Sequence, residues 1–364
     1  MNIAMLNWGA FDFMSGVKMY IVNLAQNLAD RGHQVYIITS NNVLPSYHRS
    51  DITFLTIDND EYSERGFANY FRYCVKMVDK FSIDVLHTHC NIGYIVSNKI
   101  KQIRKTPYFI SFHGYEYRFM DESLLNYKKA LSNADYMFFQ SLEIAENINS
   151  ILDLKIDDRY VYMPNAVNLN EGTQCSSIVD RKIILFVGRL VKEKGLVYLF
   201  EAIKNLREEK DIELHVVGSG TLRDWCDTYI EENNLSDCIR MIGELPHTET
   251  TQKMIESYMV VIPSLYESMS TVLLEAMAAG KPIIASNAYG VTTVIENMKN
   301  GIIVQKENSS VIAKGIKMLL NDNRLCELLG KNARDKIKRD FSWEIIAGRI
   351  EEYYVKALNK GVPN

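Results

Sequence analysis

Short apolar runs alternate with amphipathic segments in the first half of the chain. The apolar positions from Met19 to Ala29 recur at helical spacing, and Gly32 follows where a helix would end. Strands that are apolar throughout and separated by helices are typical of a parallel sheet buried on both faces. The strands predicted in this half are Asn2–Leu6, Val35–Thr39, Asp84–His87 and Tyr108–Phe112.

The same alternation begins again after a polar, Gly- and Ser-containing stretch at 169–181, which we predict to be a linker. A helix is predicted at Leu196–Leu206. The chain should therefore form two doubly wound α/β domains that face each other, at 1–168 and 182–343. The strands predicted in the second half are Ile183–Val187, Glu213–Val217, Val260–Ile262 and Pro282–Ala285.

The composition and net charge of the chain exclude some classes of function. The 364 residues include 41 Lys and Arg against 45 Asp and Glu, and a net charge of −4 argues against a nucleic-acid partner. The first basic residue is Lys18, so no secretory signal is expected, and the six scattered cysteines are typical of reduced thiols. We therefore expect a cytoplasmic protein. The helix predicted at Phe67–Phe81 leaves peripheral contact with the inner face of a membrane open, although packing on its own sheet is the commoner arrangement.

The densest group of candidate functional residues follows the strand Val260–Ile262. Ser270 and Thr271 are typical N-cap residues, so the N–H groups of the next helical turn could bind an anion such as phosphate. Glu267 precedes this helix and Glu275 lies one turn inside it, where carboxylates could accept hydrogen bonds from vicinal hydroxyls. From these residues alone, a capped helix with two acidic residues that favour its dipole is an equal alternative.

Several motifs occur together in a fixed order: Glu267-x7-Glu275 with Ala-Met-Ala-Ala-Gly, Gly188-Arg189-Leu190 with Lys194-Gly195, His113-Gly114, Asp84–His89 and Phe341-Ser342-Trp343. This set resembles the retaining nucleotide-sugar glycosyltransferases of family four, also called group 1. The resemblance implies a GT-B fold, in which two Rossmann-like domains border a cleft. It also implies an acceptor-binding N-terminal domain, a donor-binding C-terminal domain, and a last helix at about 344–364 that packs back on the N-terminal domain.

The resemblance assigns roles to individual residues. Arg189 and Lys194 would grip the diphosphate, which needs fixed cations as it departs. Glu267 would contact the hydroxyls of the donor sugar and Glu275 those of the ribose. The catalytic set is His113, Arg189, Lys194 and Glu267. The donor-binding set is Gly16, Gly188, Gly218, Leu245, Met269, Ser270, Thr271 and Glu275.

No metal site is expected. Asp58-Asn59-Asp60 fits a metal-binding pattern of another glycosyltransferase fold, but Asx residues after an apolar run usually form a turn. His87-Thr88-His89 lacks a third ligand at suitable spacing, so strand-end packing is the better interpretation.

Some positions depart from the family pattern. Ser268-Met269-Ser270 replaces a Gly-rich segment, which should bring a side chain into the donor pocket, and only one glycine, Gly16, stands where the family often has two. The predicted function is transfer of a sugar, with retention of configuration, from a UDP- or GDP-linked donor to a glycan, lipid-linked or small-molecule hydroxyl in glycan or polysaccharide biosynthesis. No other cofactor is expected. The alternatives are a non-catalytic nucleotide-sugar-binding or docking subunit, and a sugar-nucleotide epimerase of the same fold.

Overall fold

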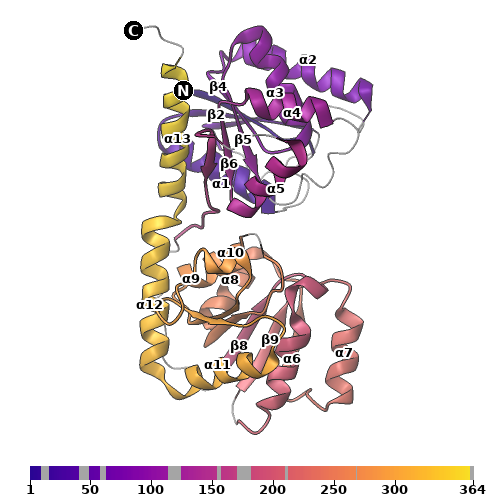
Figure 1. Cartoon of the computed structure of the whole chain (residues 1–364), viewed down its shortest axis with the longest axis vertical. Coiled ribbons are helices and arrows are strands. Elements are labelled where there is room, and N and C mark those ends of the chain that lie inside the picture. Colours follow the sequence, from indigo (N-terminus) through magenta and orange to yellow (C-terminus); the bar gives the residue numbers. More distant parts are fainter. Residues whose placement is uncertain are drawn as a thin grey trace. The chain divides into compact units, whose positions relative to one another are not determined.

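The computed structural model describes residues 1–9, 16–40, 49–57, 63–113, 124–153, 157–169, 182–209, 212–267 and 269–360. The chain forms two compact units, the first made of Met1–Asn165 with Trp343–Asn364 and the second of Ala166–Ser342 (Figure 1). The chain thus passes between units at 165–166 and at 342–343, where the sequence-based bounds were 168 and 343. Nearly all of the predicted linker, 170–181, lies outside the described residues.

The first unit is built on a seven-stranded parallel sheet in the order β3-β2-β1-β4-β5-β6-β7. Its strands are β1 (Asn2–Leu6), β2 (Gln34–Ser40), β3 (Ile52–Ile57), β4 (Val85–Thr88), β5 (Tyr108–Phe112), β6 (Tyr136–Phe139) and β7 (Tyr160–Tyr162). Its helices are α1 (Gly16–Asp30), α2 (Glu64–Lys80), α3 (Asn91–Arg104), α4 (Leu124–Asn133), α5 (Leu142–Leu152) and α13 (Trp343–Asn359).

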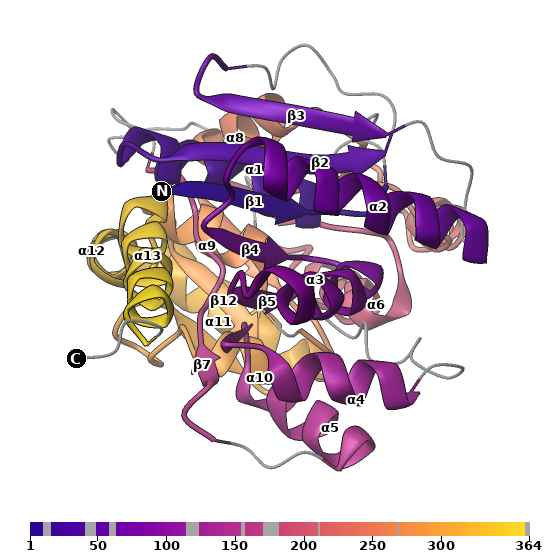
Figure 2. The same cartoon turned by 90° about the horizontal axis from the view of Figure 1, so that it is seen from above.

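The two faces of this sheet are covered by different helices. Residues of α2 to α5 share one buried cluster with Leu86 and Ile110. On the other face, Tyr354 of α13 packs edge-on against Phe109, and α13 also packs against α1 (Figure 2). Glu351 of α13 accepts a hydrogen bond of 2.5 Å from Arg31. The last helix is therefore part of the core of the first unit.

The second unit repeats the plan with a six-stranded parallel sheet in the order β10-β9-β8-β11-β12-β13. Its strands are β8 (Lys182–Val187), β9 (Ile212–Val217), β10 (Ile239–Gly243), β11 (Met259–Ile262), β12 (Ile283–Ser286) and β13 (Ile302–Val304). Its helices are α6 (Leu196–Asn205), α7 (Arg223–Glu232), α8 (His247–Glu256), α9 (Thr271–Ala278), α10 (Tyr289–Thr292), α11 (Ser309–Asn321) and α12 (Asn323–Asp340). The two sheets confirm the predicted pair of Rossmann-like domains.

The apolar face of helix α2 is packed inside the first unit. Tyr70, Cys74 and Val78 are buried in the core of the first unit, and Phe67 and Phe71 are partly buried beside the Lys99 ammonium. The face considered for membrane contact is thus packed on the unit's own core. Among the residues that the structure describes, no helix is long and apolar enough to cross a bilayer.

Candidate active site

Two loops of the second unit that are far apart in sequence lie directly against each other. The loop after β8 contains Gly195, whose φ is +66° and whose added Cβ would stand 2.0 Å from the carbonyl oxygen of Pro263. The backbone N–H of Leu265 donates to the carbonyl of Glu193 at 2.8 Å. Because β8 and β11 are neighbouring parallel strands, their following loops meet at the carboxyl edge of the sheet.

This contact brings two of the predicted catalytic side chains together. Lys194 Nζ lies 2.5 Å from Glu267 Oε2, with 22% and 11% of the two side chains exposed. The Ser264 hydroxyl donates to the same carboxylate oxygen at 3.4 Å, and the backbone N–H of Gly290 donates to the Glu267 carbonyl at 2.9 Å. A fixed cation and a fixed carboxylate therefore stand side by side.

Helix α9 begins four residues after Glu267, with Ser270 as its N-cap. The Ser270 hydroxyl accepts from the N–H of Leu273 at 3.3 Å, and its carbonyl accepts from Leu274 at 3.2 Å. The N–H groups of Thr271 and Val272 belong to the first turn, where a helix supplies no acceptor. The predicted N-cap is confirmed, and those two N–H groups can donate to an anion.

Glu275 has a partner that the sequence did not indicate. Its Oε1 lies 3.0 Å from Nε2 of His247, the first residue of α8, whose side chain is 60% exposed. The hydrogen bond to Glu275 raises the pKa of His247 above its usual value. A helix-start histidine 28 residues away carries no signal of this pairing in the sequence.

Two glycine-containing loops and the end of β10 meet at the same edge. The N–H of Gly218 donates to Gly243 at 2.8 Å, and a Cβ added to Gly218, whose φ is +134°, would stand 2.0 Å from the Gly188 carbonyl oxygen. Leu245, two residues beyond Gly243, is partly buried, and Ser219 donates to Glu244 at 2.9 Å. The close backbone approach requires glycine at 218.

Two of the predicted site residues, Arg189 and Met269, differ from their neighbours in solvent exposure. Arg189 is exposed and makes no ion pair within the described parts of the chain, unlike Lys194. Met269 is only 5% exposed, so its side chain packs inside the unit. Burial of this apolar side chain is favourable, and the expectation that the altered 268–270 segment brings a side chain into the donor pocket stays a prediction. Ser268 lies outside the described residues.

The first unit holds the other two predicted residues. His113 follows β5 and Gly16 opens α1, one turn before Tyr20, whose ring packs edge-on against the His113 ring at 4.7 Å between centroids. His113 Nε2 lies 3.0 Å from His89 Nδ1, and His113 Nδ1 lies 3.2 Å from Gln140 Nε2. Burial lowers the pKa of His113 to about 3, so its imidazole is neutral at physiological pH.

His87 is packed inside the same unit, where hydroxyl groups contact both of its ring nitrogens. Its Nδ1 lies 2.6 Å from the Tyr354 hydroxyl, and its Nε2 lies 2.8 Å from the Ser111 hydroxyl. Within the described residues, no group of three or more His, Cys, Asp or Glu side chains could hold a metal ion. The Asp58–Asp60 motif lies outside them.

Family models match both halves of the chain. The family model of glycosyl transferases group 1 matches residues 174–336, and the glycosyl transferase 4-like model matches residues 13–141. This chain belongs to the GT-B glycosyltransferases of group 1, also described as glycosyl transferase 4-like. The first model spans the Lys194–Glu267 pair and Glu275, and the second spans Gly16 and His113.

Relatives and solved structures extend over the whole chain. An uncharacterized glycosyltransferase of Methanocaldococcus jannaschii is 28% identical, covering 98% of this chain and 99% of that protein. Sucrose-phosphate synthase from Thermosynechococcus elongatus has a TM-score of 0.78 at 21% identity, over 99% of this chain and all of that one. HepE of Anabaena, solved with UDP, has a TM-score of 0.79 at 17% identity, over 98% of this chain and 100% of that one. The two solved structures share the fold.

Proposed function

We propose that this glycosyltransferase moves a sugar from a UDP- or GDP-linked donor to an acceptor hydroxyl with retention of anomeric configuration. The observation that carries the proposal is the contact of Lys194 with Glu267, four residues before helix α9 begins. One sheet edge thus offers a cation and N–H donors for a diphosphate, and a carboxylate for the hydroxyls of a sugar.

Different residues of the site would bind different parts of the donor. Arg189, Lys194 and the segment from Met269 through Ser270 to Thr271 would bind the diphosphate. Glu275, held by His247, would accept hydrogen bonds from the ribose diol. The nucleobase would lie along the backbone near Leu245. The tight contact between Gly188 and Gly218 would keep that edge clear of side chains.

The proposed step is a substitution on one face of the sugar. The acceptor oxygen forms a bond to the anomeric carbon while the bond from that carbon to the diphosphate oxygen breaks, and the electron pair leaves with the diphosphate. The acceptor's proton goes to the departing phosphate oxygen. Lys194 and Arg189 stabilise the charge that develops there. We propose no metal ion and no cofactor besides the donor itself.

The acceptor is proposed to bind the first unit near Gly16 and His113. A glycan, a lipid-linked glycan or a small molecule with a hydroxyl would each satisfy this chemistry. Synthesis of a glycan or polysaccharide in the cytoplasm, with a lipid-linked acceptor at the inner face of a membrane as one case, is the proposed setting.

Nucleotide-dependent stabilisation tests donor binding. Thermal unfolding is followed with UDP, GDP, ADP and their sugar conjugates for the native chain, Glu275→Ala and Glu232→Ala, a matched control at the exposed end of α7. A ligand at a hundred times its Kd stabilises the native state by about 2.7 kcal/mol. UDP is the first probe because HepE was solved with it. Stabilisation of the native chain and Glu232→Ala, but not Glu275→Ala, supports the proposal; no shift at millimolar nucleotide contradicts it.

Product analysis tests the reaction. Incubation of the preferred donor with a panel of hydroxyl acceptors should release nucleoside diphosphate in an acceptor-dependent way, and NMR of the product should show the donor's anomeric configuration. An inverted product would contradict retention. Nucleotide release without any acceptor would favour the epimerase alternative, and binding without turnover would favour a docking subunit.

A further inference from the structure

Both ring nitrogens of His113 are hydrogen bonded inside the first unit. Gln140, the residue after β6, approaches Nδ1 at 3.2 Å, and His89, the residue after β4, approaches Nε2 at 3.0 Å. His89 and Gln140 are almost fully buried, at 2% and 5% exposure. Three neighbouring strands thus deliver three side chains to one hydrogen-bonded chain at the carboxyl edge of the sheet.

The direction of each hydrogen bond follows from proton accounting. An amide nitrogen can only donate, and Gln140 Nε2 uses its two protons on Asn165 Oδ1 and His113 Nδ1. His113 Nδ1 is therefore an acceptor, so the neutral ring carries its proton on Nε2 and donates it to His89 Nδ1. His89 then carries its own proton on Nε2, a buried nitrogen with no acceptor among the described residues. The chain of donors runs from Gln140 to His113 to His89.

Adding a proton to His113 would disrupt this chain. An imidazolium donates from both nitrogens, so Nδ1–H would face the N–H of Gln140. Burial already lowers the pKa of His113, and it lowers the pKa of His89 as well, with further contributions from the nearby His87 and His113. The neutral form is thus favoured by both desolvation and hydrogen bonding.

We propose that Gln140 and His89 are positioning residues that fix His113 as a neutral imidazole with its proton on Nε2. The role of His113 in catalysis rests on the proposed function. In that reaction His113 is a rigid, uncharged contact, and the acceptor's proton passes to the diphosphate rather than to the imidazole. An imidazole held in one tautomer keeps one pattern of donor and acceptor atoms throughout the reaction.

The orientation of the Gln140 amide is the point on which the proposal can fail. If the amides of Gln140 and Asn165 were both reversed, Gln140 would accept from His113 Nδ1–H, and His89 Nδ1–H would donate to His113 Nε2. The two arrangements predict opposite tautomers of His113. Ring nitrogen NMR distinguishes them because a protonated and an unprotonated imidazole nitrogen differ strongly in chemical shift.

The experiment uses the full chain labelled with ¹⁵N-histidine, its seven histidines assigned by single substitution. The native protein should show His113 protonated at Nε2 and unprotonated at Nδ1, with no titration between about pH 5.5 and 8. Gln140→Glu places a carboxylate opposite Nδ1 and should move the proton there. Gln102→Glu, the same change on an exposed position of α3, should leave the His113 signals unchanged. A native Nδ1–H tautomer, or titration of His113 near neutral pH, would overturn the proposal.

Activity gives a second readout once a donor is known. Gln140→Glu should lower kcat by about tenfold or more, because a displaced proton and a charge beside the ring replace the rigid, uncharged imidazole contact, with little change in the KM for the donor. Gln102→Glu should match the native chain. An unchanged kcat in Gln140→Glu with a shifted tautomer would overturn the positioning role. The NMR measurement needs no nucleotide, so absence of donor binding would contradict the proposed function without altering the tautomer result.

Discussion

The Lys194 ammonium is held at 2.5 Å from the Glu267 carboxylate by two loops that are 73 residues apart in sequence. An ammonium group has three protons, so Lys194 can keep this contact and still donate to a phosphate oxygen. Glu267 likewise has a second carboxylate oxygen for a sugar hydroxyl. Under the proposed function, the pair would therefore hold the two halves of a donor at the bond that breaks, without separating when the donor binds.

Removing the cation should affect both stability and turnover. Lys194→Met leaves Glu267 with a largely buried charge, which should lower the free energy of unfolding by about 1–3 kcal/mol. Loss of a fixed charge at the departing diphosphate should lower kcat/KM by about a hundredfold or more. Chemical denaturation and steady-state kinetics measure the two effects.

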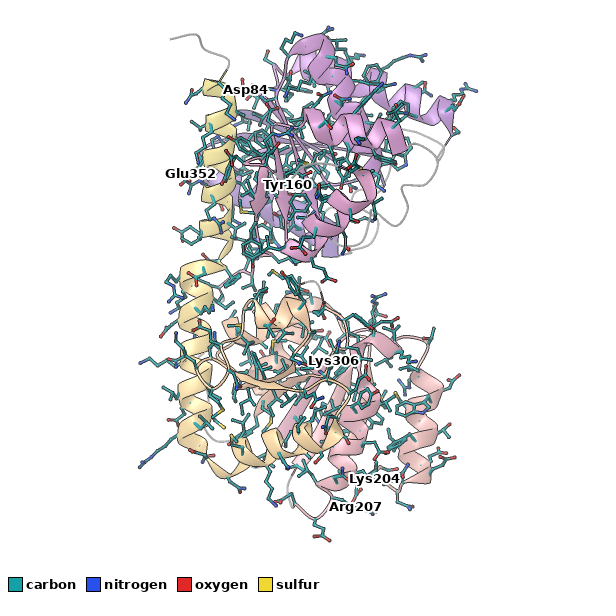
Figure 3. All side chains as sticks on the ribbon, viewed as in Figure 1. Asp84, Tyr160, Lys204, Arg207, Lys306 and Glu352 are labelled. Atoms are coloured by element: carbon teal, nitrogen blue, oxygen red, sulfur yellow. The ribbon has the colours of Figure 1, made fainter. Side chains whose placement is uncertain are left out.

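A matched control and a double variant separate these effects. Figure 3 shows Lys204 and Arg207 at the opposite end of the second unit from α8, α9 and α10, so Lys204→Met should change neither quantity. Lys194→Met combined with Glu267→Gln removes the unpaired charge and should recover stability but not turnover. Full turnover in Lys194→Met would exclude a role for this ammonium in the reaction.

The contact between His247 and Glu275 should make the stability of the second unit pH-dependent above the ordinary histidine pKa of about 6.5. Glu275 raises the pKa of His247, so the folded state binds the proton more tightly than the unfolded chain does. The stabilisation is complete below the unfolded pKa of about 6.5 and is lost as pH rises through the raised folded value. Because His247 is 60% exposed, the effect should stay below about 1 kcal/mol.

NMR titration of His247 measures this directly. Glu275→Gln should return the His247 pKa toward its ordinary value and remove the associated decrease in thermal stability. An identical His247 pKa in the native chain and in Glu275→Gln would show that the contact is absent in solution.

Two predicted donor-site glycines should respond differently to alanine. Gly218→Ala would force a Cβ to 2.0 Å from the Gly188 carbonyl at a φ of +134°, so it should lower the free energy of unfolding by about 2–4 kcal/mol and weaken nucleotide binding. Among the described residues, no atom lies within 4 Å of a Cβ added to Gly16, which opens α1, so Gly16→Ala should change stability by less than about 0.5 kcal/mol. Denaturation of both variants tests this. Equal stability losses would show that the two sites share a packing role.

Strands could be predicted from the sequence where a run of apolar residues marks them. The eight predicted strands match β1, β2, β4, β5, β8, β9, β11 and β12 to within one residue at each end. Strands β7 and β13 have three residues each, too few to show a period, and each is held by a single neighbouring strand. Strand β10 lies at a sheet edge and contains Arg240, so its sequence does not resemble a buried strand.

The candidate site was predictable in its loops but not in its contacts. Parallel strands place their following loops at one edge, so motif spacing was enough to gather Gly188, Gly218 and Glu267. Which side chains touch depends on packing between segments far apart in sequence. The contact of Gln140 with His113 and that of His247 with Glu275 have no local pattern. Met269 shows the same limit, since only the folded core decides whether an apolar loop residue is buried.

The buried histidines of the first unit should make the protein sensitive to mild acid. Burial lowers the pKa of His87 to about 3, with a smaller contribution from the neighbouring His113. In the unfolded chain the same imidazole titrates near pH 6.5, so unfolding takes up a proton at any pH between these values. Stability is complete above the unfolded pKa and falls as pH decreases toward the folded one, with a slope proportional to the protons taken up.

The variant His87→Gln tests this cause. Glutamine can still contact the hydroxyls of Tyr354 and Ser111 but has no charge to gain. The number of protons taken up on unfolding between pH 5 and 6.5, which sets the slope of the unfolding free energy against pH, should therefore fall by about one. Carboxyl groups titrate mostly below this window. Denaturant titrations of the native chain and the variant at several pH values give the slope whatever the change in absolute stability. Identical slopes would mean that His87 is already protonated in the folded protein, which its complete burial argues against.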